Sequence, residues 1–453
     1  MDKRICELID GYREEYIDTL KRWVRIPSVK GEAEPGAPFG REVRNMLDLA
    51  MADARKLGFD AVRDCDGYAC DITLGTAEET IAVLGHLDVV PVGDGWTKDP
   101  FQCVIEDGKI YGRGTNDDKG PVLAALFAMR AIREAGIPLK KSIRMILGGD
   151  EESGMEDMEY YGEHFGIPDV GFSPDADFPL INTEKGMLGF FLRAPAAQSG
   201  LKILELYTGD RFNVIPGECT ALVEGGAELA EKVKAYAEKT GLPYTAEVTD
   251  RGVQLAAVGI PGHSAHPEGR RNAIGMMLLL LKELGAESPV ATLAETVGME
   301  SDGRSLGIAC RDEVSGALTC NMGILHLENG AWFATLDCRC PISADLEKLR
   351  DTAVSKLKGF EIESNMKAPH HVPAESELVR GLLAAYEEES GLKGEAMSTG
   401  GGTYAKELKQ GVAFGALFPG EEDVAHQADE YEKIDSLMLA MKIYANALCR
   451  LAI

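Results

Sequence analysis

Hydrophobic residues recur with two different periods along the first part of the chain. Between positions 5 and 20 they fall three or four residues apart, which is typical of a helix. Shorter apolar runs at 81–84 and 142–147 have the length of buried strands, and they flank a helical pattern at 122–135 that ends at Gly136. Because strands and helices alternate in this way, we predict an α/β fold with a mostly parallel sheet sandwiched by helices.

The pattern changes in the middle of the chain, where strand-like runs such as 188–193 and 201–208 follow one another closely. Further segments follow the same two periods: helices at 38–57, 228–240, 273–284, 343–358, 376–390 and 433–451, and strands at 318–327, 331–338 and 412–418. We therefore predict a catalytic domain formed by residues 1–186 and 373–453, interrupted by an α+β lid domain at residues 187–372.

The composition narrows the classes of partner. The chain has 453 residues, too many for a single core, and its net charge of −27 repels phosphate, so we expect no nucleic-acid partner. The first seven residues carry charges rather than an apolar signal segment, and no apolar run is long enough to span a membrane. The ten cysteines are scattered without a C-x-x-C zinc spacing, which is typical of reduced thiols. We therefore expect a cytoplasmic protein with no membrane partner.

Histidines and carboxylates follow the predicted strands at the point where each strand ends. His86 and Asp88 come after one strand, the acidic run 150–152 after the next, Asp175 after a third and His426 shortly after a later one. In an open α/β sheet, ligands gather beyond the carboxyl ends of the strands. Each piece alone has an ordinary explanation as a cap, a turn or solvated charge. Imidazoles combined with a surplus of carboxylates at strand ends favour a two-metal hydrolytic site.

Five short motifs, taken in order, resemble those of one enzyme family. They are His86-Leu87-Asp88, Asp117-Asp118-Lys119-Gly120, Glu151-Glu152, Pro174-Asp175-Ala176 and the late His426. This order is similar to that of the two-metal peptidase and amidohydrolase family that includes peptidase V, carnosinase, carboxypeptidase G and succinyl-diaminopimelate desuccinylase. The forms around Asp117 and Asp175 most resemble those of the peptidase V dipeptidases. The motifs lie between about residues 80 and 430, so the resemblance covers nearly the whole chain.

The resemblance implies a role for each residue of the cluster. One metal ion would be held by His86 and Asp175 and the other by Glu152 and His426, while Asp117 would bridge both. The ions would be Zn²⁺ or Mn²⁺, and Co²⁺ also suits mixed imidazole and carboxylate ligands.

The neighbours of these ligands have implied roles as well. We favour Asp117 over Asp118 as the bridge, and the family's pattern implies a cis peptide bond after Asp117. Asp88 would orient His86 through a hydrogen bond. Glu151 would remain free of the metals and act as the general base toward the attacking water.

Segments of the predicted lid and one later loop resemble substrate-binding motifs. Within residues 262–267 we favour His266 over His263 as the group that polarises the scissile carbonyl. Asn213 and Arg339 resemble lid positions that bind substrate, and an arginine can clasp a carboxylate with two hydrogen bonds. The glycine-rich loop 398–405 lacks a P-loop ending, and its amides would hold the substrate's carboxylate. The loop residues that carry this prediction are Gly401, Gly402 and Thr403.

Together these residues predict a dinuclear metallopeptidase, namely a dipeptidase whose substrates carry a free C-terminal carboxylate. Lid closure would complete the site and exclude water. An N-acyl amino acid deacylase or a small-peptide aminopeptidase of the same family stays open, because the sequence does not show the size of the pocket. A catalytically silent metal-binding scaffold is the alternative from another class, and the unligated Glu151 argues against it. The large lid resembles that of monomeric peptidase V, so we expect a monomer.

Overall fold

The computed structural model describes residues 2–196 and 200–453, which form two compact units. Unit 1 comprises the chain up to Asn182 together with His371–Met397 and Gly402–Ile453, and unit 2 comprises Thr183–His370 and Ser398–Gly401. Unit 2 thus includes four residues of the glycine-rich loop that the sequence assigns to the catalytic domain.

The main sheet of unit 1 has a parallel centre. Its central strands are β6 (Ser142–Gly148), β3 (Thr80–His86), β7 (Val170–Ser173) and β24 (Gln410–Ala413), and neighbours among them run parallel. The flanking strands β1 (Ala61–Cys65), β2 (Ala69–Leu74) and β9 (Leu180–Glu184) pair in antiparallel fashion, and β22 (His370–His371) and β23 (Ala396–Thr399) complete the sheet. The predicted α/β fold with a mostly parallel sheet is confirmed.

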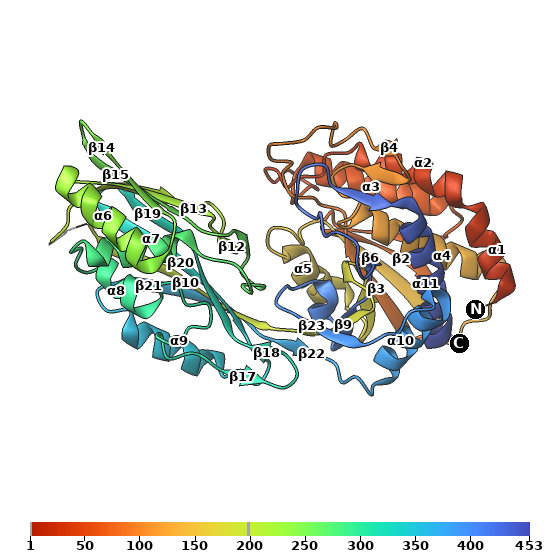
Figure 1. The fold of residues 1–453 in the computed structure, drawn as a ribbon. Coiled ribbons are helices and arrows are strands. Elements are labelled where there is room, and N and C mark those ends of the chain that lie inside the picture. Colours follow the sequence, from red (N-terminus) through yellow and green to blue (C-terminus); the bar gives the residue numbers. More distant parts are fainter. Residues whose placement is uncertain (1, 197–199) are drawn as a thin grey trace. The chain divides into compact units, whose positions relative to one another are not determined.

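Helices cover both faces of this sheet, as Figure 1 shows. Successive residues of a strand point to opposite faces. Ile81 and Val83 of β3 belong to the larger hydrophobic core, whereas Ala82 and Leu84 belong to a smaller core with Tyr161. The helices of unit 1 are α1 (Lys3–Gly11), α2 (Arg13–Val24), α3 (Arg41–Lys56), α4 (Lys119–Ala135), α5 (Glu156–Phe165), α10 (Glu377–Ser390), the 3₁₀ helix η1 (Tyr404–Glu407) and α11 (Ile434–Ala452).

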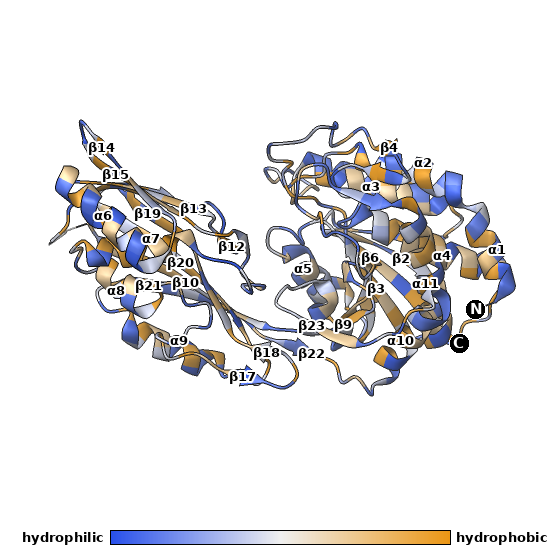
Figure 2. Ribbon diagram, viewed as in Figure 1, coloured by the Kyte–Doolittle hydropathy of each residue, from blue (hydrophilic) through white to orange (hydrophobic). Residues whose placement is uncertain are grey.

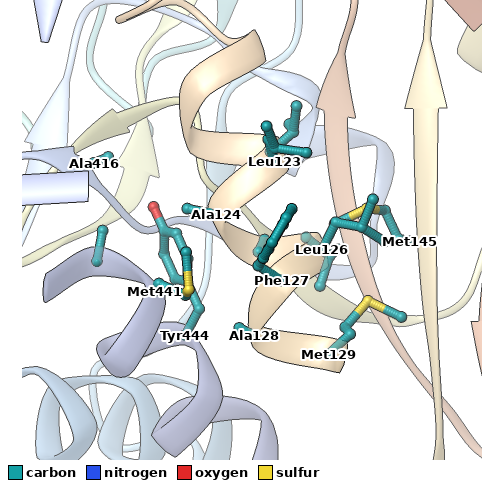
Figure 3. Close-up of a cluster of buried hydrophobic side chains, with 14 of the residues drawn as sticks. Leu123, Ala124, Leu126, Phe127, Ala128, Met129, Met145, Ala416, Met441 and Tyr444 are labelled. Carbon is teal, nitrogen blue, oxygen red and sulfur yellow. The ribbon is translucent and has the colours of Figure 1, made fainter. Parts of the chain in front are cut away.

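The larger core includes the contact between α4 and α11. Phe127 of α4 and Met441 and Tyr444 of α11 are buried there, and Figure 3 shows these side chains together. Gly136 ends α4 in the left-handed conformation, with φ of 70°, as the sequence predicts. Replacing a buried Phe by Ala typically costs about 3–5 kcal/mol. Packing of this kind fixes α4, and with it the loop immediately before α4 that carries Asp117.

Two predicted elements are wrong in detail. The single helix expected over positions 5–20 is divided into α1 and α2 at Tyr12, directly after Gly11, a poor helix former. The strand expected at 412–418 divides into β24 and β25 (Ala416–Leu417) at Gly415, which has φ of 80°. The two pieces pair with different strands: β24 pairs with β7, whereas β25 pairs with β8 (Ala176–Asp177).

Unit 2 is built on an eight-stranded antiparallel sheet. In spatial order its strands are β14 (Tyr244–Thr249), β15 (Gly252–Val258), β13 (Glu218–Val223), β11 (Ile203–Thr208), β19 (Thr319–Glu328), β20 (Ala331–Cys340), β10 (Gly186–Pro195) and β21 (Glu361–Lys367). The helices are α6 (Ala227–Thr240), α7 (Ala273–Glu283), α8 (Val290–Thr296) and α9 (Leu346–Lys356). Figure 2 shows the apolar character of α7, whose residues Ile274 and Leu278 are fully buried in the core of unit 2.

Several short strands complete the described structure. Unit 1 has a small sheet of β4 (Val104–Glu106), β5 (Lys109–Tyr111) and β26 (Tyr431–Lys433), and unit 2 has the pairs β12 (Val214–Ile215) with β16 (Gly262–His263) and β17 (Arg311–Asp312) with β18 (Gly316–Ala317). Within residues 2–196 and 200–453, no helix combines the length and apolar character needed to cross a membrane.

Candidate metal centre

The predicted ligands of unit 1 come from different segments and lie together. His86 is the last residue of β3, Glu152 follows β6, Asp175 follows β7, and Asp117 stands just before α4. His426 lies in the loop after β25 and adopts a left-handed conformation with φ of 61°. The carboxyl ends of parallel strands therefore bring these side chains to one edge of the sheet.

Asp117 occupies the middle of the cluster. Its Oδ1 lies 2.9 Å from Nε2 of His86, and its Oδ2 lies 3.0 Å from Nε2 of His426. The same His426 nitrogen is 2.9 Å from Oε1 of Glu152, and His86 Nε2 is 3.8 Å from Oδ2 of Asp175. The two oxygens of Asp117 thus contact two different histidines.

Asp118 has different surroundings from Asp117. The peptide bond between the two residues is cis, which confirms that prediction. Oδ2 of the buried Asp118 accepts a hydrogen bond from the backbone N–H of His86 at 3.3 Å. Asp118 nevertheless has an oxygen close to the ligand atoms of His86 and Asp175, so it adds a further carboxylate to this side of the cluster.

Burial and mutual repulsion shape the pKa values of these groups. Burial, together with the charge of Asp117, holds the pKa of Asp175 well above its ordinary range. Burial also raises the pKa of Glu151 to about 8. Burial alone would raise the pKa of Asp117, but hydrogen bonds with the two histidines outweigh it and lower that pKa. Burial alone would lower the pKa of His426, but hydrogen bonds to Asp117 and Glu152 outweigh it and raise that pKa to about 11.

This donor set fits divalent metal ions. Two groups of side chains within the described ranges have ligand atoms within 4.8 Å of one another: His86 with Asp117 and Glu152, and His86 with Asp118 and Asp175. Both combine imidazole with carboxylate, the donors that Zn²⁺ and Mn²⁺ accept. Cations at this position would also offset the repulsion between the buried carboxylates.

Asp88 connects two parts of the site. Nδ1 of His86 lies 3.0 Å from the backbone oxygen of Asp88 and 3.4 Å from its Oδ1. The Asp88 carboxylate also accepts hydrogen bonds from the backbone N–H groups of Glu151 and Glu152, each at 3.2 Å. Asp88 therefore holds the Glu151–Glu152 segment as well as contacting the His86 ring.

The residues predicted to bind substrate in unit 2 contact partners within that unit. Nδ2 of Asn213 lies 3.3 Å from Nε2 of His263. Arg339, which is 4% exposed, donates from Nε and Nη2 to Oδ2 of Asp337 at 3.2 and 2.9 Å, and from Nη1 to the backbone oxygen of Gly400 at 2.6 Å. The bidentate edge of this guanidinium therefore already contacts a carboxylate of the protein.

His266 and the glycine-rich loop supply the other predicted substrate contacts. His266, Lys185, Thr319 and Gly400 are among the residues that line a cavity of about 360 Å³ in unit 2. In the loop, the N–H of Gly401 donates to Oγ1 of Thr399 at 3.0 Å. The Thr403 hydroxyl caps η1 by accepting from the N–H of Ala405 at 3.1 Å, and Gly402 lies between these two turns.

Residues 82–450 match the model of Peptidase family M20/M25/M40. The chain belongs to this family. It is therefore a hydrolase of a metal-dependent peptidase family, and the predicted family resemblance is confirmed.

Relatives of this M20/M25/M40 family member match it along almost its whole length. The chain is 38% identical to the "Putative dipeptidase YtjP" of Bacillus subtilis (strain 168), over 97% of this chain and 98% of the relative. It is 30% identical to the "Beta-Ala-Xaa dipeptidase" of Lactobacillus delbrueckii subsp. lactis, over 100% and 99%.

Solved structures share the fold at low sequence identity. Human carnosine dipeptidase 1 aligns with a TM-score of 0.60 at 17% identity, over 99% of this chain and 98% of that one. The dipeptidase Dug1p from Saccharomyces cerevisiae aligns with a TM-score of 0.62 at 15% identity, with the same coverage.

Sequence reasoning missed buried residues that support the ligand-bearing loops of this family member. Asp157 of α5 accepts hydrogen bonds from the backbone N–H groups of Gly149 and Asp150, at 2.6 and 2.9 Å, and from the Tyr404 hydroxyl. A Cβ at Gly148 would lie 2.2 Å from Oδ2 of Asp157, so a larger residue there would displace this carboxylate. Lys119 belongs to the motif that begins at Asp117, and the structure adds how it is held: it donates to the backbone oxygens of Trp23 and Ile26 at 3.2 and 2.8 Å, and burial lowers its pKa to about 7.

Proposed function

We propose that this protein is a dipeptidase that uses two divalent metal ions to hydrolyse dipeptides with a free C-terminal carboxylate. The observation that carries the proposal is the position of Asp117, whose two carboxylate oxygens contact His86 and His426 separately. The names of the full-length relatives, a putative dipeptidase and a β-Ala-Xaa dipeptidase, favour dipeptides as substrates.

The ligand set would divide between the two ions. His86 and Asp175 would hold one, Glu152 and His426 the other, and Asp117 both. Zn²⁺ and Mn²⁺ both suit these donors, and Co²⁺ does as well. Two bound ions would supply Lewis acidity to the scissile carbonyl and lower the pKa of a shared water toward neutrality.

Glu151 would move the proton. Glu151 belongs to neither group of candidate ligands. Its carboxylate would therefore be free to accept a proton from the attacking water and pass it to the leaving amine. Burial raises the pKa of this carboxyl to about 8. The two proposed cations beside it would lower that pKa and keep Glu151 ionised at neutral pH, as a general base must be. Asp88 would keep Glu151 in place through the backbone N–H bonds described above.

The substrate's ends would be recognised by residues of unit 2 and the glycine-rich loop. We assign the carboxylate to Arg339 and to the loop residues Gly401, Gly402 and Thr403, and the scissile carbonyl to His266, with Asn213 as a further contact. For this to occur, Arg339 must bind substrate while Asp337 holds its Nε edge, because both Nε and Nη2 already donate to Asp337.

We further propose that the enzyme acts as a monomer in the cytoplasm. Each of the ten cysteines is a free thiol, as a reducing compartment requires. The large inserted unit 2 resembles the lid of monomeric peptidase V, which supports a monomer.

The test is hydrolysis of a panel of dipeptides, tripeptides and N-acyl amino acids by chelator-stripped protein reloaded with Mn²⁺ or Zn²⁺. We expect metal-dependent cleavage of dipeptides. Glu151→Ala should lower kcat by about 10²–10⁴-fold, the usual contribution of general acid–base catalysis, without lowering the metal content. Glu159→Ala, an exposed acid on the nearby helix α5, is the matched control and should leave kcat unchanged.

Other results would contradict the proposal in distinct ways. Cleavage of acyl amino acids instead of dipeptides would make the protein a deacylase of the same family. Full metal binding with no turnover of any substrate would point to a catalytically silent scaffold. Normal kcat in Glu151→Ala would remove that residue from the proton path.

A further inference from the structure

Glu430 is a buried carboxylate close to the candidate metal centre that the mechanism above does not use. It is fully buried and lies four residues after His426, just before β26. We propose that Glu430 is a positioning residue, which fixes the bridging carboxylate of Asp117 relative to His426. The proposal rests on the proposed metal centre and adds to it a residue that contacts neither metal nor substrate.

The side chain of Glu430 holds the loop that ends at Asp117. Its Oε1 accepts hydrogen bonds from the backbone N–H groups of Gly114, Asn116 and Asp117 at 2.9, 3.0 and 3.3 Å. Its backbone oxygen accepts from the N–H of Gly112 at 2.9 Å. One residue therefore sets the path of the main chain from position 112 to 117.

Arg113 compensates the buried charge of Glu430. The guanidinium is 1% exposed, and its Nη1 donates to Oε2 of Glu430. Arg113 also reaches the backbone oxygens of Pro91 and Val92 and lies over the ring of Trp96. A buried carboxylate without such partners is strongly unfavourable. The loop and the Glu430 segment are therefore held together by charge as well as by backbone hydrogen bonds.

The segment that carries Glu430 is itself fixed close to His426. Asp429 accepts hydrogen bonds from the N–H groups of Thr97 and Lys98 at 2.8 and 3.1 Å, and from the Thr97 hydroxyl at 2.7 Å. Residues 426–430 thus carry both a predicted ligand and the anchor for the predicted bridge. The result is visible in the 3.0 Å separation of His426 Nε2 and Asp117 Oδ2.

A neighbouring residue offers a matched control. Glu432 is also a buried carboxylate, with an exposed fraction of 2%. Its Oε2 accepts from the side-chain amide of Asn116, and its Oε1 from the N–H of Lys433, so it does not hold the main chain at Asp117. If neutralising any buried acid weakened metal binding, both Glu430→Gln and Glu432→Gln would lose metal affinity. If Glu430 positions Asp117, only Glu430→Gln would lose it.

The experiment measures metal affinity of the full-length protein by competition with a chromogenic chelator, using Mn²⁺ and Zn²⁺ separately. Removing a residue that orients metal ligands typically costs 10–100-fold in affinity. We expect a loss of this size in Glu430→Gln and little change in Glu432→Gln. The melting temperature should fall more in Glu430→Gln, because the buried guanidinium of Arg113 loses its carboxylate, so affinities are compared at a temperature at which both variants are folded. If the protein cleaves a dipeptide, the fold decrease in kcat of Glu430→Gln should exceed the fold increase in its KM. Glu430→Asp retains the charge but is one methylene too short, and it should show an intermediate loss.

Wild-type affinity in both Glu430 variants, or an equal loss in Glu432→Gln, would overturn the proposal. If Glu430→Gln does not fold, Glu430→Asp decides by the same comparison. Metal affinity is measured without substrate, so the two proposals can fail separately. A wild-type protein that binds metal and cleaves no dipeptide would refute the proposed function. The affinity loss in Glu430→Gln would still confirm the role of Glu430.

Discussion

The predicted ligands of unit 1 and the predicted substrate residues of unit 2 are held in place by different means. In unit 1, buried carboxylates accept hydrogen bonds from backbone N–H groups: Asp88 holds Glu151 and Glu152, and Glu430 holds the loop to Asp117. In unit 2, Arg339 is held by its contacts with Asp337 and with the backbone oxygen of Gly400.

These two kinds of contact fix the positions of side chains with different precision. A backbone hydrogen bond fixes the main chain and therefore several side chains at once, which suits metal ions that tolerate little error in ligand position. A contact through a guanidinium fixes one side chain and leaves its long methylene stem adjustable. Losses in unit 1 should therefore affect metal binding as well as activity, whereas losses in unit 2 should affect substrate binding or turnover and leave metal binding unchanged.

The largest effect is expected from His426→Ala. It removes a proposed ligand, and it takes away the imidazole that contacts Oε1 of Glu152 and Oδ2 of Asp117. We expect activity to fall by more than about a hundredfold, given the size of metal-dependent contributions to catalysis, and bound metal to fall in parallel, as measured by elemental analysis. His164→Ala, an exposed histidine of α5, should change neither quantity. Full metal content in His426→Ala would exclude it as a ligand.

Removal of the metals should distinguish the two units by their stability. Ions that bind only the folded state stabilise it by about 2.7 kcal/mol at a concentration of 100 times Kd. Because the candidate ligands all lie in unit 1, we expect a chelator to lower the unfolding temperature of that unit in calorimetry and to leave the transition of unit 2 unchanged. Equal shifts in both transitions, or none, would contradict the assignment of the metals to unit 1.

The smallest of these effects is expected from Arg339→Met. Hydrogen bonds to charged groups are each worth about 1.5–3 kcal/mol, so we expect kcat/KM to fall by about 10–100-fold, mainly through KM, with metal content unchanged. The control is Arg251→Met, which breaks an exposed pair with Glu205 and should have no effect on catalysis. A loss confined to kcat would mean that Arg339 acts on the transition state rather than on the carboxylate.

Much of this arrangement can be predicted from short-range patterns. Apolar runs identify β3 and β6, and a glycine marks the end of α4, because these signals depend on neighbouring residues alone. The predicted ligands His86, Glu152 and Asp175 follow strands of the main sheet, so a parallel sheet leads one to expect them at one edge.

The supporting residues could not be predicted in this way. Asp157 binds Tyr404, which is distant in sequence, and it lies on α5, a helix of ten residues whose buried apolar side chains are Met158 and Tyr161. Glu430 accepts from backbone N–H groups, which every residue but proline carries, so its partners leave no mark in the sequence. The only available signal was an acidic residue closely following His426.

The interruption of unit 1 by unit 2 has a consequence for biosynthesis. Domains fold as units, beginning with the segments that leave the ribosome first. Unit 2 is almost continuous in sequence, so on this principle it would fold while unit 1 still lacks its last segments. His426 and Glu430 are translated only after all of unit 2, so a nascent chain that already contains His86 and Asp175 would lack part of the proposed metal centre. The proposed hydrolytic activity would thereby be withheld from partly synthesised protein.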